Sequence, residues 1–302
     1  MGFCNLTEAV VRGSDTKETL KEKIRLATIL GTFQSTLTNF KYLRKQWKDN
    51  ADEERLLGVS LTGIMDSVLT NQPHPKHLQE LREFAVETNK EWAKKLGINQ
   101  SVAVTTVKPS GTVSQLTNSA SGIHARHNEF YIRRVRGDKK DPLSALMQDA
   151  GFHCEDDVMK PDSTVVFSFP QKAPKGGVSR TDQTALDQLN IWKVYRDNWT
   201  EHNPSCTISV KEHEWMAVGA WVYENFDEVG GLSFLPYADS SYRQMPYEDC
   251  TEAEYKALVE ATPTEVDWAK LSDYEEVDGT TGSQELACSA GGCEIVDIIG
   301  GS

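Results

Sequence analysis

Apolar residues recur at helical spacing in two long stretches near the start of the chain. The first follows Ser14-Asp15-Thr16, a polar run typical of a helix start, and its apolar positions are Leu20, Ile24, Ala27, Leu30, Leu37 and Phe40. The second begins at Pro75, stops at Gly97 and carries Leu78, Leu81, Phe84, Trp92 and Leu96. Both patterns predict long helices.

Short runs of β-branched residues alternate with further helix-like stretches. Residues 101–107, Ser-Val-Ala-Val-Thr-Thr-Val, are most simply a buried strand. Similar patterns predict strands over residues 164–169, 207–210 and 232–235, helices over 181–199 and 212–226, and a capping box at 251–254 that starts a late helix. Strands that alternate with helices favour an α/β fold with parallel strands.

The end of the chain has no amphipathic period. After about residue 274 it becomes acidic and then rich in Gly, Thr and Ser, which predicts a mobile tail over residues 275–302 behind a folded portion of residues 1–274. Cys288 and Cys293 lie in this tail, where close spacing and small intervening residues would allow a disulfide ring. A redox arm, half of a metal site and two incidental thiols are the possible interpretations. Zinc is disfavoured because no second Cys/His cluster lies nearby.

Composition narrows the class of protein. The 302 residues are 38% hydrophobic and 25% charged, as in soluble globular proteins, and no apolar run approaches the ~20 residues that span a bilayer. The formal net charge of −13 argues against a general nucleic-acid binder. The 6 cysteines are too sparse for a disulfide-stapled secreted protein. With no signal segment at the start, these features favour a cytoplasmic protein without a membrane partner.

The predicted strand at 101–107 leads directly into Lys108-Pro109-Ser110-Gly111-Thr112-Val113-Ser114-Gln115-Leu116. A strand, a tight turn with one glycine and a helix start rich in Ser and Thr can bind an anion, because backbone N–H groups, hydroxyls and the helix dipole face one point. Gly111 would let a ligand approach the backbone closely. The same turn also suits ordinary helix capping, so local chemistry leaves both interpretations open.

Several motifs occur together in the order and wording of one known family. They are residues 3–8, 58–66, 104–116, 121–127, 131–136, 203–210 and 221–227, with the terminal cysteine pair. Together they resemble the monomeric adenosylcobalamin-dependent ribonucleoside-triphosphate reductases, the class II ribonucleotide reductases. The resemblance covers essentially the whole chain, and motifs in a fixed order are far more specific than any one alone.

The resemblance implies a fold and a set of roles. The fold would be the carboxy-terminal part of a ten-stranded α/β barrel built from two parallel half-sheets, with a flexible carboxy-terminal tail. Cys4 matches the second member of the active-site thiol pair, which gives two electrons to the substrate. Cys288 and Cys293 match the shuttle pair that re-reduces it and is recharged by thioredoxin. The phosphates of a ribonucleoside triphosphate would be held by Ser110, Gly111, Thr112, Val113 and Ser114. Adenosylcobalamin would be the cofactor of the complete enzyme, and no metal site is implied.

Other chemically suggestive residues receive plainer interpretations. His124 and His127 have the look of a metal pair, but we interpret them as loop residues near the substrate or cobalamin. The basic run from Arg133 to Arg136 is expected to be a solvated face and not a triphosphate clamp. The three remaining thiols are expected to be structural: Cys154, Cys206 and Cys250.

One departure from the family concerns the radical step. In the family an Asn-x-Cys-x-Glu motif precedes the cysteine matched by Cys4, and its cysteine carries the thiyl radical; the 302 residues contain no such motif. We therefore expect that cysteine in an amino-terminal reductase segment that partners this chain, and no activity from the chain alone. Two origins of the chain are consistent with this departure: a fragment of a longer enzyme, or one product of a split gene, as in a phage. The alternatives are a non-catalytic remnant that binds nucleotide or a protein, and a stand-alone thiol–disulfide carrier.

Overall fold

The structure is a computed structural model that describes residues 2–237 and 242–275. These residues form two compact units. The first consists of Met1–Tyr131, Gln171–Tyr242 and Tyr247–Glu252; the second consists of Ile132–Pro170, Arg243–Pro246 and the described residues after Glu252. The predicted redox pair, Cys288 and Cys293, lies outside the described residues.

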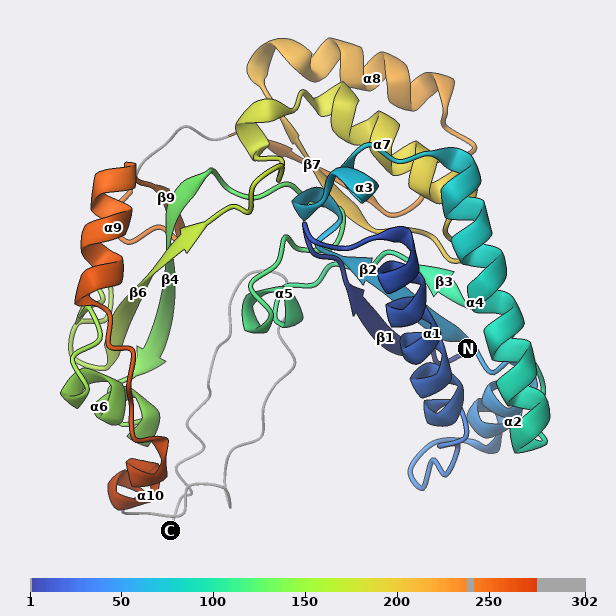
Figure 1. Ribbon diagram of the computed structural model, residues 1–302, viewed down its shortest axis with the longest axis horizontal. Coiled ribbons are helices and arrows are strands. Elements are labelled where there is room, and N and C mark those ends of the chain that lie inside the picture. The colour runs from blue at the N-terminus through green and yellow to red at the C-terminus, as the bar shows by residue number, and fades with distance from the viewer. Residues whose placement is uncertain (1, 238–241, 276–302) are drawn as a thin grey trace. The chain divides into compact units, whose positions relative to one another are not determined.

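A three-stranded parallel sheet organises the first unit (Figure 1). In spatial order its strands are β1 (Asn5–Val10), β2 (Leu57–Thr62) and β3 (Thr105–Thr106). The register places Leu6 beside Gly58 and Ser60 beside Thr106. β3 is much shorter than the strand predicted over residues 101–107.

Two long helices cover one face of this sheet and match their sequence patterns. α1 (Lys17–Gln34) starts at Thr16, whose side chain accepts a hydrogen bond from the N–H of Thr19, and α4 (Pro75–Leu96) ends at Gly97 with φ 66°. Leu37 and Phe40, which the pattern placed on the first helix, lie beyond its end. Shorter helical segments in this part of the chain are α2 (Lys45–Glu54), η1 (Ile64–Asp66), α3 (Val68–Asn71) and α5 (Val113–Leu116).

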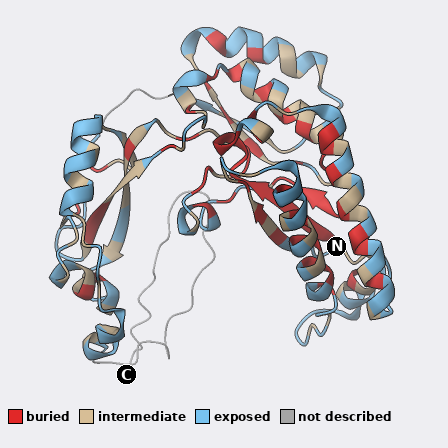
Figure 2. Ribbon diagram, viewed as in Figure 1, coloured by how far each residue is buried: buried red, intermediate tan, exposed pale blue. Residues whose placement is uncertain are grey.

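The hydrophobic core lies between this sheet and its helices (Figure 2). Leu57, Val59 and Leu61 of β2 are fully buried on the side that faces α1. Gly31 lets α1 approach closely, because a Cβ atom there would lie 3.2 Å from the side chain of Leu57. The helix-covered face is therefore apolar, which leaves the opposite face for polar side chains.

A second parallel pair completes the first unit. It consists of β7 (Cys206–Val210) and β8 (Leu232–Pro236), accompanied by η2 (Arg180–Asp182), α7 (Ala185–Asn198), η3 (Glu212–Glu214) and α8 (Trp215–Glu224). The segment that leads into β7 runs beside β3, since the N–H groups of Glu201 and Ser205 donate to the carbonyls of Thr105 and Val107, both at 3.0 Å. The predicted helices and strands of this region are thereby confirmed to within a few residues.

The remaining sheet has four strands in the order β5-β6-β4-β9. Its strands are β4 (Phe130–Asp138), β5 (Cys154–Asp156), β6 (Thr164–Lys172) and β9 (Tyr247–Asp249), and the nearby helical segments are α6 (Pro142–Asp149), α9 (Glu252–Ala261), η4 (Trp268–Lys270) and α10 (Leu271–Tyr274). The basic run lies in β4 and is not simply a solvated face. Arg133 donates to the carbonyl of Pro246 at 3.2 Å, and Arg136 binds Asp157 at 2.7 Å.

The predicted mixture of helices and parallel strands is confirmed. Within residues 2–237 and 242–275, however, the sheets remain separate and none closes into a barrel. In the same ranges, no helix combines the length and the apolar character needed to cross a lipid bilayer.

We predict that position 63, directly after β2, requires glycine. Both its backbone conformation and the atoms around it disfavour a side chain. Its φ is 77°, and a Cβ atom would lie 2.6 Å from the carbonyl oxygen of Val11. Gly97 has a similar φ of 66° but nothing within 4 Å of a Cβ position, so it is a matched control. Gly97→Ala should lower the free energy of unfolding by about 1 kcal/mol, and Gly63→Ala by at least twice as much. Equal losses in urea titrations would contradict this account.

Candidate functional site

The face of the three-stranded sheet that the helices leave open is polar. Side chains alternate along each strand, so Gly58, Ser60 and Thr62 of β2 share this face. Leu6 and Thr106 lie on it too, because their side-chain atoms would be 2.9 and 3.5 Å from a Cβ atom at Gly58. A sheet that is apolar on one side and polar on the other offers hydrogen-bonding groups to whatever covers the polar side.

The segment after β3 covers this polar face and is held there by hydrogen bonds. The N–H of Lys108 donates to the hydroxyl of Ser60 at 3.0 Å. The hydroxyl of Ser110 donates to the carboxylate of Glu8 at 2.7 Å, and the N–H of Ser110 donates to the hydroxyl of Ser121 at 3.1 Å. The start of the predicted phosphate loop is therefore fixed to two strands of the sheet.

The five predicted phosphate-binding residues divide into two kinds. Ser110 and Ser114 are buried, and the hydroxyl of Ser114 donates to the carbonyl of Ser110, so both hydroxyls hold the loop together. Gly111, Thr112 and Val113 are exposed. Their N–H groups donate to no described residue, as expected at the start of a helical turn. These three N–H groups and the Thr112 hydroxyl are therefore the donors that remain for an anion.

The far end of the loop is fixed by a buried ion pair that the sequence did not reveal. Nε and Nη2 of Arg126 donate to the two carboxylate oxygens of Asp66 at 2.9 and 2.8 Å, and both residues are almost fully buried. Asp66 also accepts from the N–H of Ala120 at 2.8 Å, and Arg126 donates to the side chain of Asn118 at 3.0 Å. One pair thus sets the path of the chain from Asn118 to Arg126.

Cys4 lies at the amino end of β1, close to the polar face. Its Sγ would be 2.6 Å from a Cβ atom at Gly58, so glycine at that position makes room for the thiol. Cys4 is exposed, yet the partial burial of its thiol raises the pKa, and the charge of Lys108 offsets this only in part. The thiol is therefore largely protonated at neutral pH. By contrast, Cys206 is buried, with a pKa raised by burial to about 12, in keeping with a structural role.

The two histidines after the loop are engaged in structural contacts. Nδ1 of His124 lies 2.9 Å from the carbonyl of Ser121, and its Nε2 accepts from the N–H of Thr207 at 2.9 Å, so neither nitrogen remains for a ligand. The ring of His127 stacks on that of Tyr247 with centroids 5.5 Å apart. Burial and the charge of Arg180 lower the pKa of His127 to about 4, so its ring is neutral near pH 7.

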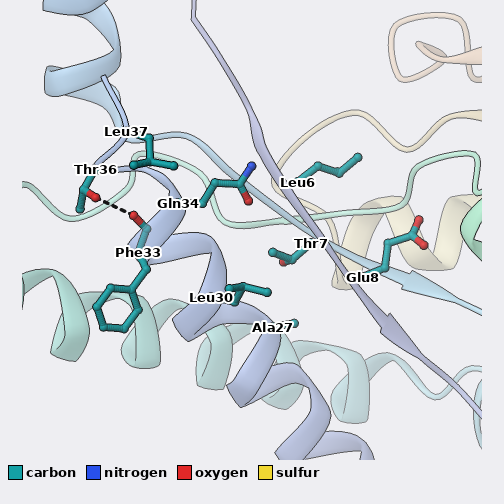
Figure 3. A pocket seen from close by; sticks show the side chains of 9 residues that line it. All are labelled: Leu6, Thr7, Glu8, Ala27, Leu30, Phe33, Gln34, Thr36 and Leu37. Carbon is teal, nitrogen blue, oxygen red and sulfur yellow. Dashed lines mark hydrogen bonds between the residues drawn. The ribbon is translucent and has the colours of Figure 1, made fainter. Parts of the chain in front are cut away.

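A groove of about 570 Å³ runs along the outer side of β1 (Figure 3). Leu6, Thr7 and Glu8 of β1 form one wall, and α1 and the residues after it form the other, through Ala27, Leu30, Phe33, Gln34, Thr36 and Leu37. The groove is mostly apolar, and Leu30 and Leu37 are 62% and 73% exposed. β1 is also the edge strand of its sheet among the described residues, so this side of the unit carries both free strand edge and uncovered apolar surface.

Comparison with known proteins gives a consistent set of relatives, although no protein-family model matches the chain. A probable adenosylcobalamin-dependent ribonucleoside-triphosphate reductase of Dictyostelium discoideum is 29% identical over 269 residues, which cover 83% of this chain and 34% of that protein. The adenosylcobalamin-dependent ribonucleoside-triphosphate reductase of Lactobacillus acidophilus is 25% identical over 324 residues, covering 97% and 43%. That of Euglena gracilis is 26% identical over 283 residues, covering 91% and 38%. The chain spans less than half the length of each.

A solved structure of a reductase of this kind has a similar fold. The crystal structure of a B-12-dependent (class II) ribonucleotide reductase superposes with a TM-score of 0.77 at 23% sequence identity, over 92% of this chain and 42% of that one. The mixed α/β arrangement described above is therefore that of a segment of this known structure.

We predict that the Asp66–Arg126 pair is essential for stability. Arg126→Ala would leave a buried carboxylate without its partner, which costs about 3–5 kcal/mol of unfolding free energy. Arg25→Ala, which breaks the exposed Glu22–Arg25 pair on α1, is the matched control and should leave the free energy of unfolding nearly unchanged, because water screens an exposed pair. Urea titrations of both variants measure the difference, and a loss of less than about 1 kcal/mol for Arg126→Ala would refute the prediction.

Proposed function

Because the chain is homologous to a segment of the adenosylcobalamin-dependent class II ribonucleotide reductases, we propose that it forms the carboxy-terminal part of such an enzyme. Its parallel strands would contribute one half of the ten-stranded barrel. The reaction would convert ribonucleoside triphosphates to deoxyribonucleotides with thiols as reductant. The observation that carries the proposal is the exposed loop at Gly111–Val113, whose N–H groups donate to no described residue and whose preceding residues are bonded to the sheet face next to Cys4.

The loop supports a phosphate-binding role on physical grounds. Three adjacent N–H groups that donate to no described residue could donate to phosphate oxygens. The chain around them is held by hydrogen bonds, at one end to Ser60 and Glu8 and at the other to Asp66 and Arg126. A pre-organised loop loses little conformational entropy when it binds a ligand. In this proposal Ser110 and Ser114 shape the loop, while Gly111, Thr112 and Val113 contact the phosphates.

Cys4 is the residue that we propose as a reductant. With a second thiol it would form a disulfide as the substrate C–OH becomes C–H and the hydroxyl leaves as water, so two thiol hydrogens and two electrons are accounted for. A protonated thiol, as the raised pKa of Cys4 implies, retains the hydrogen that this step consumes. Cys288 and Cys293, on the arm of residues 275–302, would then reduce this disulfide and be recharged by thioredoxin.

The described residues do not build a cobalamin site by themselves. The groove at β1 measures about 570 Å³ and is mostly apolar, and a second cavity, at Lys211 and Tyr237, measures about 470 Å³. Pockets of this size suit drug-sized ligands, and a cobalamin is far larger. We therefore assign adenosylcobalamin to the complete enzyme and no residue of this chain to its binding.

We propose an amino-terminal reductase segment as the partner that covers the groove along β1. Apolar side chains as exposed as Leu30 and Leu37 favour burial, and the free edge of β1 can pair with one more strand. This segment would also supply the Asn-x-Cys-x-Glu motif that the 302 residues lack. A stand-alone thiol–disulfide carrier would not need the anchored loop. A non-catalytic remnant would not need the thiol of Cys4.

We predict that the 302-residue chain binds ribonucleoside triphosphate through the loop. Gly111→Asp places a carboxylate among the three N–H groups and should weaken binding at least tenfold, or about 1.4 kcal/mol, by isothermal titration calorimetry. Gly219→Asp is the matched control, because Gly219 in α8 is likewise exposed with nothing within 4 Å of a Cβ position. The same change in net charge should there leave the affinity unaltered. Equal weakening by both variants would refute the site.

We predict distinct defects for the cysteines in an enzyme reconstituted from this chain, an amino-terminal segment of a class II reductase and adenosylcobalamin. Cys288→Ser or Cys293→Ser should allow one turnover from pre-reduced enzyme but no repeated turnover with thioredoxin, and a small dithiol that reaches Cys4 directly should restore cycling. Cys4→Ser should abolish even the first turnover, whereas Cys154→Ser is the control and should cycle normally.

The measured quantity is deoxynucleotide formed per enzyme in rapid-quench and steady-state assays. Tail variants that cycle normally with thioredoxin would contradict the shuttle role. Deoxynucleotide formation by the 302-residue chain alone would contradict the need for a partner segment.

A further inference from the structure

We infer that Glu8 is a positioning residue: its carboxylate, acting through the hydroxyl of Ser110, holds the loop in the form that presents the N–H groups of Gly111–Val113. This inference rests on the proposed function, since it assigns a residue to the support of the same site. Neither the sequence motifs nor the similarity to known proteins assigns a role to Glu8.

The first observation is the hydrogen bond between Ser110 and Glu8. The hydroxyl of Ser110 is 2.7 Å from Oε2 of Glu8 and has no other described acceptor, while Ser110 is 3% exposed. A hydrogen bond to a carboxylate is stronger than one between neutral groups. It joins residues 102 positions apart, on β1 and after β3, across the intervening strand β2. The bond therefore fixes where the loop leaves the sheet.

The second observation is that Glu8 has no other partner among the described residues. It forms no ion pair there, and its Oε1 receives no hydrogen bond from them. Burial raises the pKa of Glu8, and the hydrogen bond from Ser110 lowers it in part. A half-buried carboxylate without a cation opposes folding, so its location is better explained by what it holds than by the stability that it adds.

The third observation is the relation of Glu8 to Cys4. Glu8 is on β1, Cys4 directly precedes this strand, and Leu6, between them, shares the polar face with Gly58, next to the thiol. Glu8 lies beside Ser60, whose hydroxyl accepts from the N–H of Lys108. β1 thus carries the group that locates the loop and directly follows the thiol, so the positions of both depend on this strand.

Two measurements on the 302-residue chain test the inference, with variants Glu8→Ala and Glu8→Gln. The first is backbone hydrogen exchange in peptides that cover residues 109–116. The second is affinity for inorganic tripolyphosphate by calorimetry. Glu8→Ala removes the acceptor, so exchange in the loop should rise and affinity fall about fivefold to tenfold. Glu8→Gln keeps an acceptor oxygen and should remain within about twofold of the natural chain in affinity. Glu22→Ala, an exposed carboxylate on α1, is the control and should change neither.

Unchanged loop exchange in Glu8→Ala would overturn the inference, as would a rise spread over the whole first unit, which would mark a general loss of stability. Failure of Glu8→Gln to restore the loop would also overturn it. A third outcome separates the two proposals. If the natural chain bound no tripolyphosphate while Glu8→Ala still raised hydrogen exchange in residues 109–116 alone, the phosphate site would be refuted and the positioning role of Glu8 supported.

Discussion

The buried ion pair between Asp66 and Arg126 is the interaction on which the candidate site depends. It links the turn after β2 to the segment that returns from the loop, and the two side chains form further hydrogen bonds with Ala120, Asn118 and Tyr131. Burying two charges is unfavourable unless both are fully satisfied, and here the carboxylate accepts from Arg126 twice and from a backbone N–H. The pair therefore enforces one path for the chain, and that path leaves the tip of the loop exposed.

The two faces of the three-stranded sheet have different roles. One face packs into the hydrophobic core, and the other holds the candidate loop. Leu57, Val59 and Leu61 pack against α1 and form the core, while Ser60 and Thr62, which alternate with them along β2, hold the loop on the other face. The hydroxyl of Thr62 accepts from the N–H of Gly122 at 2.9 Å, as that of Ser60 does from Lys108. Alternation along a single strand is thus enough to bury a core and to position the candidate phosphate loop.

Local patterns predicted the long helices well, because caps and stops are local. Thr16 and Gly97 bound α1 and α4 as their residue types suggest. The patterns missed β4, whose arginines are held by carbonyl and carboxylate groups distant in sequence. They also missed the pairing of Asp66 with Arg126, 60 positions apart, and the inward turn of Ser110 and Ser114, because tertiary contacts alone decide these. The motif located the loop but could not say which of its donors are free.

We propose that the N–H groups of Gly111, Thr112 and Val113 bind the phosphates of the substrate. A crystal structure of the chain in complex with a ribonucleoside triphosphate tests it most directly. We expect phosphate oxygens within about 3 Å of these nitrogens, with the Glu8–Ser110 and Asp66–Arg126 contacts unchanged. A triphosphate bound elsewhere, with the loop empty, or a loop that abandons these contacts to reach it, would contradict the account.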